Sequence, residues 1–486
     1  MNYVIIYPDE MRAESLACYG HPTVKTPNID QLAKEGTLFE NNYTAHPVCV
    51  ASRCSLVTGW YPHVRGYRSQ LNLMPDTEFN FISELNEQGW TTALVGKDDC
   101  FDAESTKRLF TEYIPFPGAK RPVNDGKKHY TMIMPPAVGE EADDLVDAHC
   151  CNDTIDFIKR HAQDENPFML WVNFIAPHPP YTCPEKYYNM YQDADVPALR
   201  DDTWIKNKPD LYKYCRDFRE VEEEDPKVFV RTNAIYLGMI SFVDDMVGQI
   251  VDTLKAQGIY EDTTIVICSD HGDFAGDAKL VEKCPNGMDD MLTRVPLIIR
   301  RPGCNAGQRI NTLTQSIDIF PTLFDFENLE IEHDQFGVSL KKHIEDGTDL
   351  CDRVVYTEGG YDVREPQCFE TLGPEGSIKR KFMGKGSVYY PKLMHQEMQP
   401  ESVCRTIMRR DNQYKVVVRT NGQHELYDMK NDPLEYHNLY GDSKYQSLFN
   451  ELSMKTLLWL THTSDIVPRP SKNVKFWFED IDDAKK

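Results

Sequence analysis

Short apolar runs alternate with helical patterns along most of this chain, and that alternation restricts its fold more than any other feature. Five apolar runs have the length of a buried strand: Tyr3–Tyr7, Thr92–Val95, Phe168–Ile175, Thr264–Cys268 and Leu297–Ile299. One of them, Phe168–Ile175, is interrupted only by Asn173, as expected for a parallel strand buried on both faces. Stretches between the runs predict helices: Ile29–Gly36 with Asn28 near its N-cap, Ile82–Gly89 and Tyr236–Lys255. We therefore predict an α/β fold with a large, mostly parallel sheet sandwiched by helices.

The pattern changes beyond about residue 370. Three short strand-like pieces follow, at Thr406–Arg409, Lys415–Arg419 and Glu425–Tyr427, and turn signals such as Asn421-Gly422 separate them. A helical pattern then covers Tyr445–Leu460. The sequence predicts a large α/β domain over residues 1–370 and a small antiparallel α+β subdomain over residues 371–486.

The charge balance excludes two classes of partner. The 486 residues include 53 Lys and Arg against 77 Asp and Glu, a formal net charge of −24. Binding to nucleic acid needs clustered positive charge, and docking on an anionic membrane surface needs basic segments. We expect neither partner. The sequence has no run of about 18 apolar residues, so we also expect no membrane-spanning helix.

The 14 cysteines are scattered, and no Cys-x-x-Cys pair occurs. Disulfide frameworks are typical of small secreted chains, so the sequence predicts free thiols in a reducing compartment. Met1 leads almost directly into the strand at Tyr3–Tyr7, without the basic head and apolar stretch of a signal peptide. We expect a cytoplasmic protein, although a leader already removed from a precursor would leave no trace in this sequence.

Polar side chains follow two of the predicted strands. Asp9 and Glu10 come directly after the first strand, and Asp270 and His271 follow Thr264–Cys268. Ligands collect at the carboxyl ends of strands in open parallel sheets, and adjacent carboxylates suit a hard cation. Together the four predict one mixed oxygen and nitrogen metal site. Taken alone, each pair is more simply a helix N-cap or a polar turn.

A third candidate begins at Cys49, where a segment of small residues leads into a predicted helix. The positive end of a helix dipole binds tetrahedral oxyanions and lowers the pKa of a thiol. Arg53, four residues later, is expected to point toward Cys49 on the same helical face. A lone cysteine is more often a small buried apolar residue, so the neighbouring sequence has to support this interpretation.

That neighbouring sequence resembles a known signature. Cys49-x-Ala51-x-Arg53 followed by Thr58-Gly59 is similar to the signature of the type I sulfatases, which depend on formylglycine and belong to the alkaline phosphatase-like superfamily. Further blocks resemble that family, in its order, along nearly the whole chain: Asp9-Glu10, Thr26–Asp30, Tyr61-Pro62-His63, Ala176–Tyr181, Asp244-Asp245, Asp270-His271-Gly272, Arg294–Leu297, Asp318–Thr322 and Glu425–Asp428. The resemblance implies an alkaline phosphatase-like fold, with the catalytic sulfatase domain in residues 1–370.

The resemblance also implies an activity, the hydrolysis of a sulfate ester of a carbohydrate or of a small alcohol or phenol. In the family, a formylglycine-generating maturase oxidises the cysteine. One hydroxyl of the hydrated aldehyde attacks sulfur, the alcohol leaves, and a covalent sulfate ester remains on the enzyme. A divalent metal assists, with Ca²⁺ as the first expectation and Mn²⁺ or Mg²⁺ as alternatives. The implied metal ligands are Asp9, Glu10, Asp270 and His271. The implied catalytic residues are Cys49, Arg53, Lys97, His178 and Lys283.

Three positions depart from the family pattern. Glu10 stands where Asp is common, and His271 stands where many sulfatases have Asn. An imidazole ligand shifts the metal preference somewhat toward Mn²⁺. Asp99 replaces an expected histidine, so Asp99 is a candidate base. Two alternatives remain open: a phosphonate monoester or phosphodiester hydrolase of the same superfamily, and a non-catalytic binding homologue in which Cys49 is not converted.

The implied cations predict a local positive pocket inside an acidic molecule. Such a pocket suits one small sulfate group, so we expect a sulfated substrate that is short or presented end-on. Specificity in such folds comes from loops around the sheet and from the second domain. Three segments of irregular pattern are predicted to form the walls of the pocket: Phe101–Gly139, Glu185–Lys227 and Tyr361–Gln399.

Overall fold

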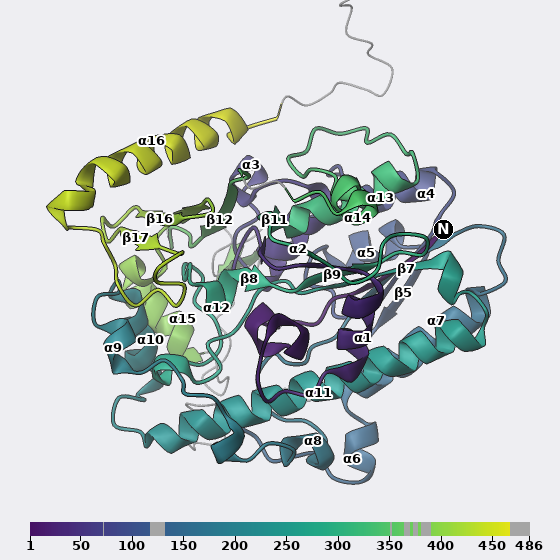
Figure 1. Ribbon diagram of the computed structural model, residues 1–486, viewed down its shortest axis with the longest axis horizontal. Helices are drawn as coiled ribbons and strands as arrows, with labels where there is room; N and C mark the ends of the chain where they lie inside the picture. Colours follow the sequence, from purple (N-terminus) through teal and green to yellow (C-terminus); the bar gives the residue numbers. More distant parts are fainter. Residues whose placement is uncertain are drawn as a thin grey trace, which may run out of the picture.

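An eight-stranded sheet forms the centre of the computed structural model (Figure 1). The structure describes residues 1–70, 72–116, 132–349, 352–363, 370–372, 378–380 and 390–466. The strand order is β10-β2-β9-β7-β1-β6-β4-β5. The bounds are β1 Asn2–Ile6, β2 Thr37–Phe39, β4 Thr91–Gly96, β5 Glu112–Pro115, β6 Phe168–Asn173, β7 Thr263–Cys268, β9 Leu297–Arg300 and β10 Gln308–Ile310. Strand β9 is antiparallel to its two neighbours and all other pairs are parallel, which confirms the predicted sheet.

Helices cover both faces of this sheet, because successive side chains of each strand point to opposite sides. Val4 and Ile6 of β1 pack into a core with helices α1, α7 and α11, while Tyr3 and Ile5 face α2, α4 and α13 (Figure 1). The bounds of the helices are α1 Pro27–Glu35, α2 Cys49–Thr58, α3 Pro62–Arg65, α4 Phe81–Glu87, α5 Ala103–Leu109, α6 Glu140–Asp143, α7 Val146–His161, α8 Glu185–Tyr188, α9 Asp202–Ile205, α10 Leu211–Arg219, α11 Pro226–Ala256, α12 Asp290–Thr293, α13 Ile319–Phe326, α14 Lys341–Asp346, α15 Tyr390–Met398 and α16 Gln446–Thr463. The predicted sandwich of helices around the sheet is confirmed.

Helix α11 is unusually long and apolar. Within the described part of the chain it is the one helix with the length and hydropathy of a membrane span, whereas the sequence predicted none. Most of its apolar stretch is buried inside the structure, where it packs against α1, α7 and α8. Burial against these helices accounts for its composition, as in the core helix of a globular fold.

Helix α1 receives its N-terminal cap from a distant residue. It begins at Pro27, and Thr26 is the N-cap residue instead of the predicted Asn28, but Thr26 makes no side-chain cap. Asp244 of α11 accepts hydrogen bonds from the backbone N–H groups of Asn28 (3.2 Å) and Ile29 (2.8 Å). A carboxylate satisfies the free N–H groups of a helix start and favours its positive end. Asp244 belongs to one of the blocks that resemble the sulfatase family, and its contacts stabilise the start of helix α1.

The C-terminal part is built on an antiparallel sheet of order β12-β15-β16-β17. Its strands are β12 Val355–Gly359, β15 Thr406–Arg410, β16 Tyr414–Arg419 and β17 Glu425–Asp428, so the predicted hairpins are confirmed. The first strand of this sheet, β12, lies before residue 371, within the range predicted for the large domain. The boundary between residues 370 and 371 remains a prediction. Helix α16 contacts this sheet, where Trp459 stacks on Tyr356 of β12 with 4.1 Å between ring centroids.

Two smaller groups of strands complete the sheets of the described residues. The three-stranded sheet β11-β3-β8 joins Thr314–Gln315, Asn42–Tyr43 and Arg294–Val295, and a separate pair joins β13 Glu370–Leu372 to β14 Ile378–Arg380.

The prediction of free thiols is wrong for one pair of cysteines. Cys215 and Cys284, 69 residues apart in the sequence, form a disulfide. Their pairing depends on the fold, which brings α10 beside the segment that follows β7. No local pattern of cysteines in the sequence predicts this pair. Ten other described cysteines are free, while Cys351 and Cys368 lie outside the described residues.

Candidate active site

Cys49 is the first residue of α2 and is only 1% exposed. Ser52, in the first turn of α2, donates a hydrogen bond through Oγ to the carbonyl of Asp270 (2.8 Å), which fastens the helix beside the end of β7. The Cys49 Sγ atom lies 3.2 Å from His271 Nε2 and 3.6 Å from Asp9 Oδ1. The predicted helix start at Cys49 is present, and it brings the cysteine to the carboxyl ends of β1 and β7.

Asp9, Asp270 and His271 surround this cysteine. The donor atoms of these residues and of Cys49 all lie within 4.8 Å of one another. Asp9 follows β1 and the other two follow β7, and these strands are parallel neighbours whose carboxyl ends meet. His271 Nδ1 lies 2.9 Å from the carbonyl of Gly272, so a proton on Nδ1 leaves the Nε2 lone pair directed at the cluster. Two carboxylates and one imidazole form a suitable donor set for a divalent cation.

The carboxylate of Glu10 belongs to a neighbouring group. Its backbone is left-handed, with φ of +64°, and its Oε1 contacts Lys283 Nζ and lies 3.1 Å from His178 Nε2. Its second oxygen, Oε2, is buried without a hydrogen-bond partner. A buried carboxylate oxygen without a partner is costly unless a cation or water completes its contacts. The residues therefore fit a divalent cation held by Asp9, Asp270 and His271, with Glu10 Oε2 as a further candidate donor.

Two cations balance the acidic cluster. Arg53 is fully buried, and its guanidinium donates to Asp270 Oδ2 (2.9 Å) and Asp9 Oδ2 (3.4 Å). Lys97, after β4, contacts Asp9 through Nζ. Burial alone would raise the pKa of Asp9, but Lys97 and Arg53 hold that pKa well below its usual value. Arg53 lies on the predicted helix, but its guanidinium donates to these carboxylates and to Asn173 instead of contacting Cys49.

Lys283 and His178 lie on the side of Glu10. Lys283 Nζ is 2.9 Å from His178 Nε2, and His178 Nδ1 is 2.5 Å from the carbonyl of Pro179. Burial and the charge of Lys283 lower the pKa of His178 to about 3. The contacts therefore fit a neutral imidazole that carries its proton on Nδ1 and accepts a hydrogen bond from the Lys283 ammonium.

Asp99 lies beside Lys97, with 2.9 Å between Asp99 Oδ2 and Lys97 Nζ. Burial alone would raise the pKa of Asp99, but Lys97 and Arg53 bring it below its ordinary value. The carboxylate is therefore ionised at neutral pH and able to accept a proton, while its role as a base remains a prediction.

The expected fall in the pKa of Cys49 is wrong. Burial, reinforced by the negative charge of Asp9, raises the pKa of the Cys49 thiol. Both effects oppose a thiolate. The encoded thiol is therefore favoured in its protonated form in this surrounding.

Two functional contacts escaped the sequence-based prediction. Arg53 Nη1 donates to Asn173 Oδ1 (2.8 Å) at the end of β6, and the signal for Asn173 was its place as the one polar residue in an apolar run. Asp147 of α7 accepts hydrogen bonds from the N–H groups of Ile175 (2.6 Å) and Ala176 (3.1 Å), in the loop that leads to His178. No local pattern in the sequence marks Asp147.

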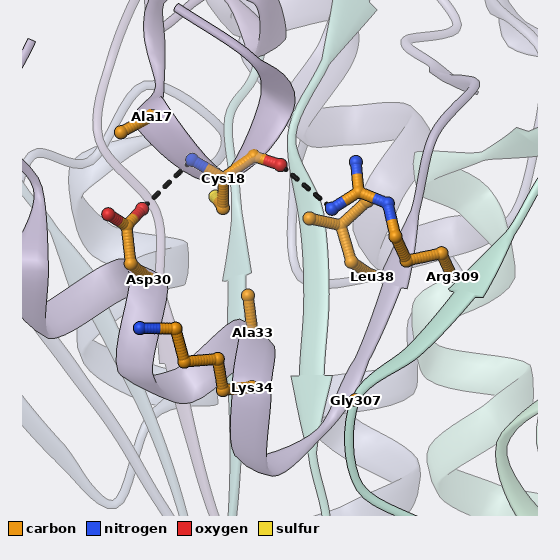
Figure 2. A pocket seen from close by; sticks show the side chains of 8 residues that line it. All are labelled: Ala17, Cys18, Asp30, Ala33, Lys34, Leu38, Gly307 and Arg309. Atoms are coloured by element: carbon orange, nitrogen blue, oxygen red, sulfur yellow. Dashed lines mark hydrogen bonds between the residues drawn. The ribbon is translucent and has the colours of Figure 1, made fainter.

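A hollow of about 280 Å³ lies elsewhere, at the β10–β2 edge of the sheet (Figure 2). Cys18 and Asp30 meet there in a backbone-to-carboxylate hydrogen bond of 2.9 Å, and Arg309 Nη1 donates to the Cys18 carbonyl (3.0 Å). Its lining shares no residue with the Cys49 cluster, so we assign it no part in the site.

Comparisons with known proteins agree with this geometry. The family model "Sulfatase" matches residues 1–327, and the model "N-sulphoglucosamine sulphohydrolase, C-terminal" matches residues 376–461. An arylsulfatase of Clostridium perfringens is 30% identical over 389 residues, covering 71% of this chain and 78% of that protein. The human iduronate 2-sulfatase is 25% identical, covering 93% of each. A phosphonate monoester hydrolase of Agrobacterium radiobacter has a similar structure, with a TM-score of 0.74, 22% identity and coverage of 95% of this chain and 96% of that chain.

The sheet and its strand order place the chain in the alkaline phosphatase-like fold class, with a cluster of acidic and imidazole side chains at the carboxyl ends of β1 and β7. The sequence matches identify the family as well as the fold class, because one family model spans about two thirds of the chain. The chain belongs to the sulfatase family, and it is a sulfuric ester hydrolase.

Proposed function

We propose that this enzyme hydrolyses a sulfate ester of a carbohydrate or of a small alcohol or phenol, with a formylglycine derived from Cys49 and a bound divalent metal, Ca²⁺ in the first instance. The observation that carries the proposal is the position of Cys49, buried at the start of α2 with its Sγ within 3.6 Å of Asp9 and His271. Relatives named arylsulfatase, choline-sulfatase and iduronate 2-sulfatase support the choice of ester. A cytoplasmic location and a maturase as partner belong to the same proposal.

The charged residues take distinct parts in this proposal. A formylglycine would supply the nucleophilic oxygen and the metal would withdraw charge from the sulfate. Arg53 and Lys97, held by Asp9 and Asp270, keep positive charge next to the transferring group without needing to rearrange. The Lys283 ammonium, whose neighbour His178 is neutral, is the group that carries an available proton for the leaving oxygen. Asp99 is the candidate acceptor of the proton released when the ester intermediate breaks down.

Metal binding predicts a change in thermal stability that does not depend on turnover. We expect Ca²⁺ to raise the midpoint of thermal unfolding of protein freed of metal with a chelator, because a cation that binds only the folded state stabilises it. A Ca²⁺ concentration 100 times the dissociation constant contributes about 2.7 kcal/mol at a single site. Asp270→Asn, which removes one donor charge, should lose most of this shift, while the partly exposed Asp325→Asn should keep it. An unchanged midpoint with Ca²⁺, Mn²⁺ and Mg²⁺ would contradict the metal site.

The type of ester is tested by comparing kcat/KM for an aryl sulfate and for an aryl phosphonate monoester. We expect the sulfate to be turned over faster by orders of magnitude. The comparison needs protein in which Cys49 has been converted, so it uses enzyme from the native host or enzyme produced together with a maturase. A phosphonate rate that exceeds the sulfate rate by orders of magnitude would replace our first choice.

The second candidate function is phosphonate monoester or phosphodiester hydrolysis at the same site. Two observations favour it: His271 provides an imidazole donor where many sulfatases have Asn, and Asp99 stands where a histidine was expected. The third possibility, a binding homologue with unconverted Cys49, predicts an intact thiol in protein from the native host.

A further inference from the structure

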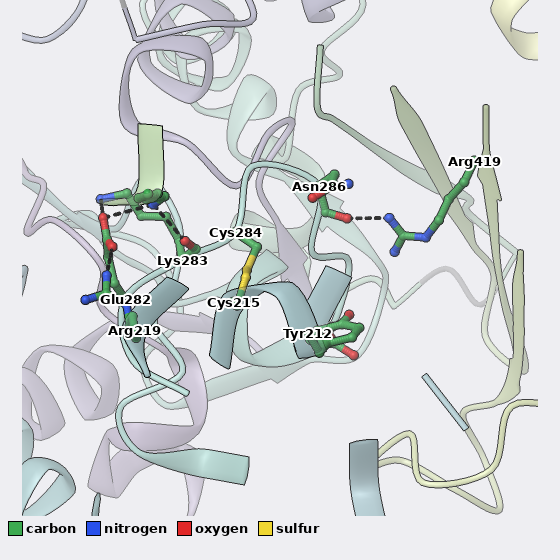
Figure 3. Close-up of a disulfide and its surroundings, with 10 residues drawn as sticks. Tyr212, Cys215, Arg219, Glu282, Lys283, Cys284, Asn286 and Arg419 are labelled. Carbon is green, nitrogen blue, oxygen red and sulfur yellow. Dashed lines mark hydrogen bonds and ion pairs between the residues drawn. A yellow bond between two sulfur atoms is a disulfide. The ribbon is translucent and has the colours of Figure 1, made fainter. Parts of the chain in front are cut away.

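Lys283 belongs to a short segment, Glu282–Cys284, that a helix of the large domain holds from one side. Figure 3 shows this segment beside α10, which carries Cys215 and Arg219. Cys284 is joined to Cys215 by a disulfide, and Arg219 forms an ion pair with Glu282 Oε2. Glu282 has φ of +64°, a left-handed conformation that a residue other than glycine keeps only where its surroundings hold it.

Helix α15 of the C-terminal part holds the same segment from another side, through Lys392. Lys392 Nζ donates to Glu282 Oε1 (3.1 Å) and to the carbonyl oxygen of Lys283 (3.1 Å). The side chains of Lys392 and Glu282 are 12% and 2% exposed, so water screens this ion pair only weakly. Arg219 and Lys392 come from two of the segments predicted to form pocket walls, although parts of Tyr361–Gln399 lie outside the described residues.

These contacts fix the position of an ammonium group at the site. Lys283 Nζ contacts Glu10, lies 2.9 Å from His178 Nε2 and lies 3.8 Å from Glu282 Oε1. As long as Lys392 and Arg219 neutralise Glu282, that carboxylate does not compete with Glu10 for Lys283. Without Lys392, Glu282 would attract the Lys283 ammonium more strongly, and the backbone of Lys283 would lose an anchor. Both effects move Nζ away from His178.

We propose that Lys392 is a positioning residue for Lys283 in the hydrolysis, acting through Glu282 and through the Lys283 carbonyl. The C-terminal part of the chain thereby helps to build an active site whose reacting groups all come from the large domain. The inference rests on the proposed function, because it requires Lys283 to meet the transferring group or the leaving oxygen. Lys392 itself touches neither.

The test compares Lys392→Met with Lys392→Arg in the full-length, converted enzyme. We expect Lys392→Met to lower kcat by about 100-fold, the cost of misplacing a reacting group by about 1 Å. KM should change little, because substrate binding to the metal and Arg53 persists. Lys392→Arg, which keeps the charge and the donors, should restore most of kcat. The double variant Lys392→Met/Glu282→Gln should lose less than the two single losses combined, because one of the two routes by which Lys392 acts passes through Glu282.

Lys415→Met is the matched control for a loss of structure. Lys415 is a buried lysine of the C-terminal sheet whose ammonium donates to Asp290 (2.6 Å), Glu435 (2.7 Å) and the Met288 carbonyl (3.0 Å), and not to the Glu282–Cys284 segment. It should lower the unfolding midpoint and leave kcat of the folded enzyme unchanged. Equal losses of kcat in Lys392→Met and Lys415→Met, or an unchanged kcat in Lys392→Met, would overturn the inference. The assay uses the aryl ester that the wild type turns over faster. If that ester is the phosphonate, by orders of magnitude, the proposed sulfate substrate is wrong. The comparison of variants with that ester still tests the role of Lys392.

Discussion

Replacing Cys49 with alanine should abolish ester hydrolysis, with a loss in kcat on the order of 10⁵-fold or more, because the variant has no side chain that can become the nucleophile. The fold should survive this change. Cys49 is small, and among the described residues its Sγ forms hydrogen-bond contacts with Asp9 and His271. The measurement is kcat for an aryl sulfate together with the unfolding midpoint of the same preparation.

Cys54→Ala provides the matched control for this prediction. Cys54 is a second buried cysteine of α2, one turn and a half further on, and its Sγ faces the carbonyl of Cys100 at 3.6 Å and not the acidic cluster. It should keep kcat near the wild-type value. Persistent turnover in Cys49→Ala, with normal folding, would rule out a nucleophile at this position.

Mass spectrometry of the peptide that contains Cys49 completes the argument, because it distinguishes a thiol from an aldehyde at this position. In active protein from the native host we expect the mass of an aldehyde in place of the thiol. Full activity with an intact thiol would contradict the formylglycine mechanism. An intact thiol without activity, in protein from the native host, would instead support the binding homologue.

The sequence predicted the residues of the site better than it predicted their partners. Asp9, Asp270, His271 and Cys49 meet as expected because they follow parallel neighbouring strands or begin a helix that packs beside them. The hydrophobic periodicity of a segment and its position in the chain determine such placements. Glu10 differs because its left-handed backbone directs its carboxylate toward Lys283 and His178, and no sequence pattern predicts that conformation.

Contacts between distant parts of the chain could not be predicted in the same way. Lys392 reaches Glu282 across 110 residues, and Cys215 reaches Cys284 across 69. Each contact depends on how α10 and α15 pack beside the segment after β7, which local propensity does not specify. Asp244 shows the complementary case, since its motif suggested function while its carboxylate caps α1. The contacts of a residue in such a block must therefore be known before a role can be assigned to that residue.

Arg53→Met should have the largest effect on stability. Arg53 is completely buried between Asp9, Asp270 and Asn173, and removing it leaves the two carboxylates without their guanidinium partner. Breaking a buried ion pair from one side costs about 3–5 kcal/mol, because the remaining charge stays desolvated. We expect that loss in the free energy of urea unfolding measured in a chelator, together with a large loss of kcat.

The same variant distinguishes charge compensation from simple packing. If the loss is electrostatic, Ca²⁺ should recover more stability in Arg53→Met than it adds to the wild type, because the cation then neutralises Asp9 and Asp270 in place of the guanidinium. Arg160→Met, which removes a half-exposed arginine paired with Glu112, should leave the unfolding free energy nearly unchanged with or without Ca²⁺. A deficit in Arg53→Met that Ca²⁺ does not reduce would mean that the lost hydrogen bonds and packing dominate. Arg53 would then stabilise the fold mainly through its hydrogen bonds and packing, and not by neutralising Asp9 and Asp270.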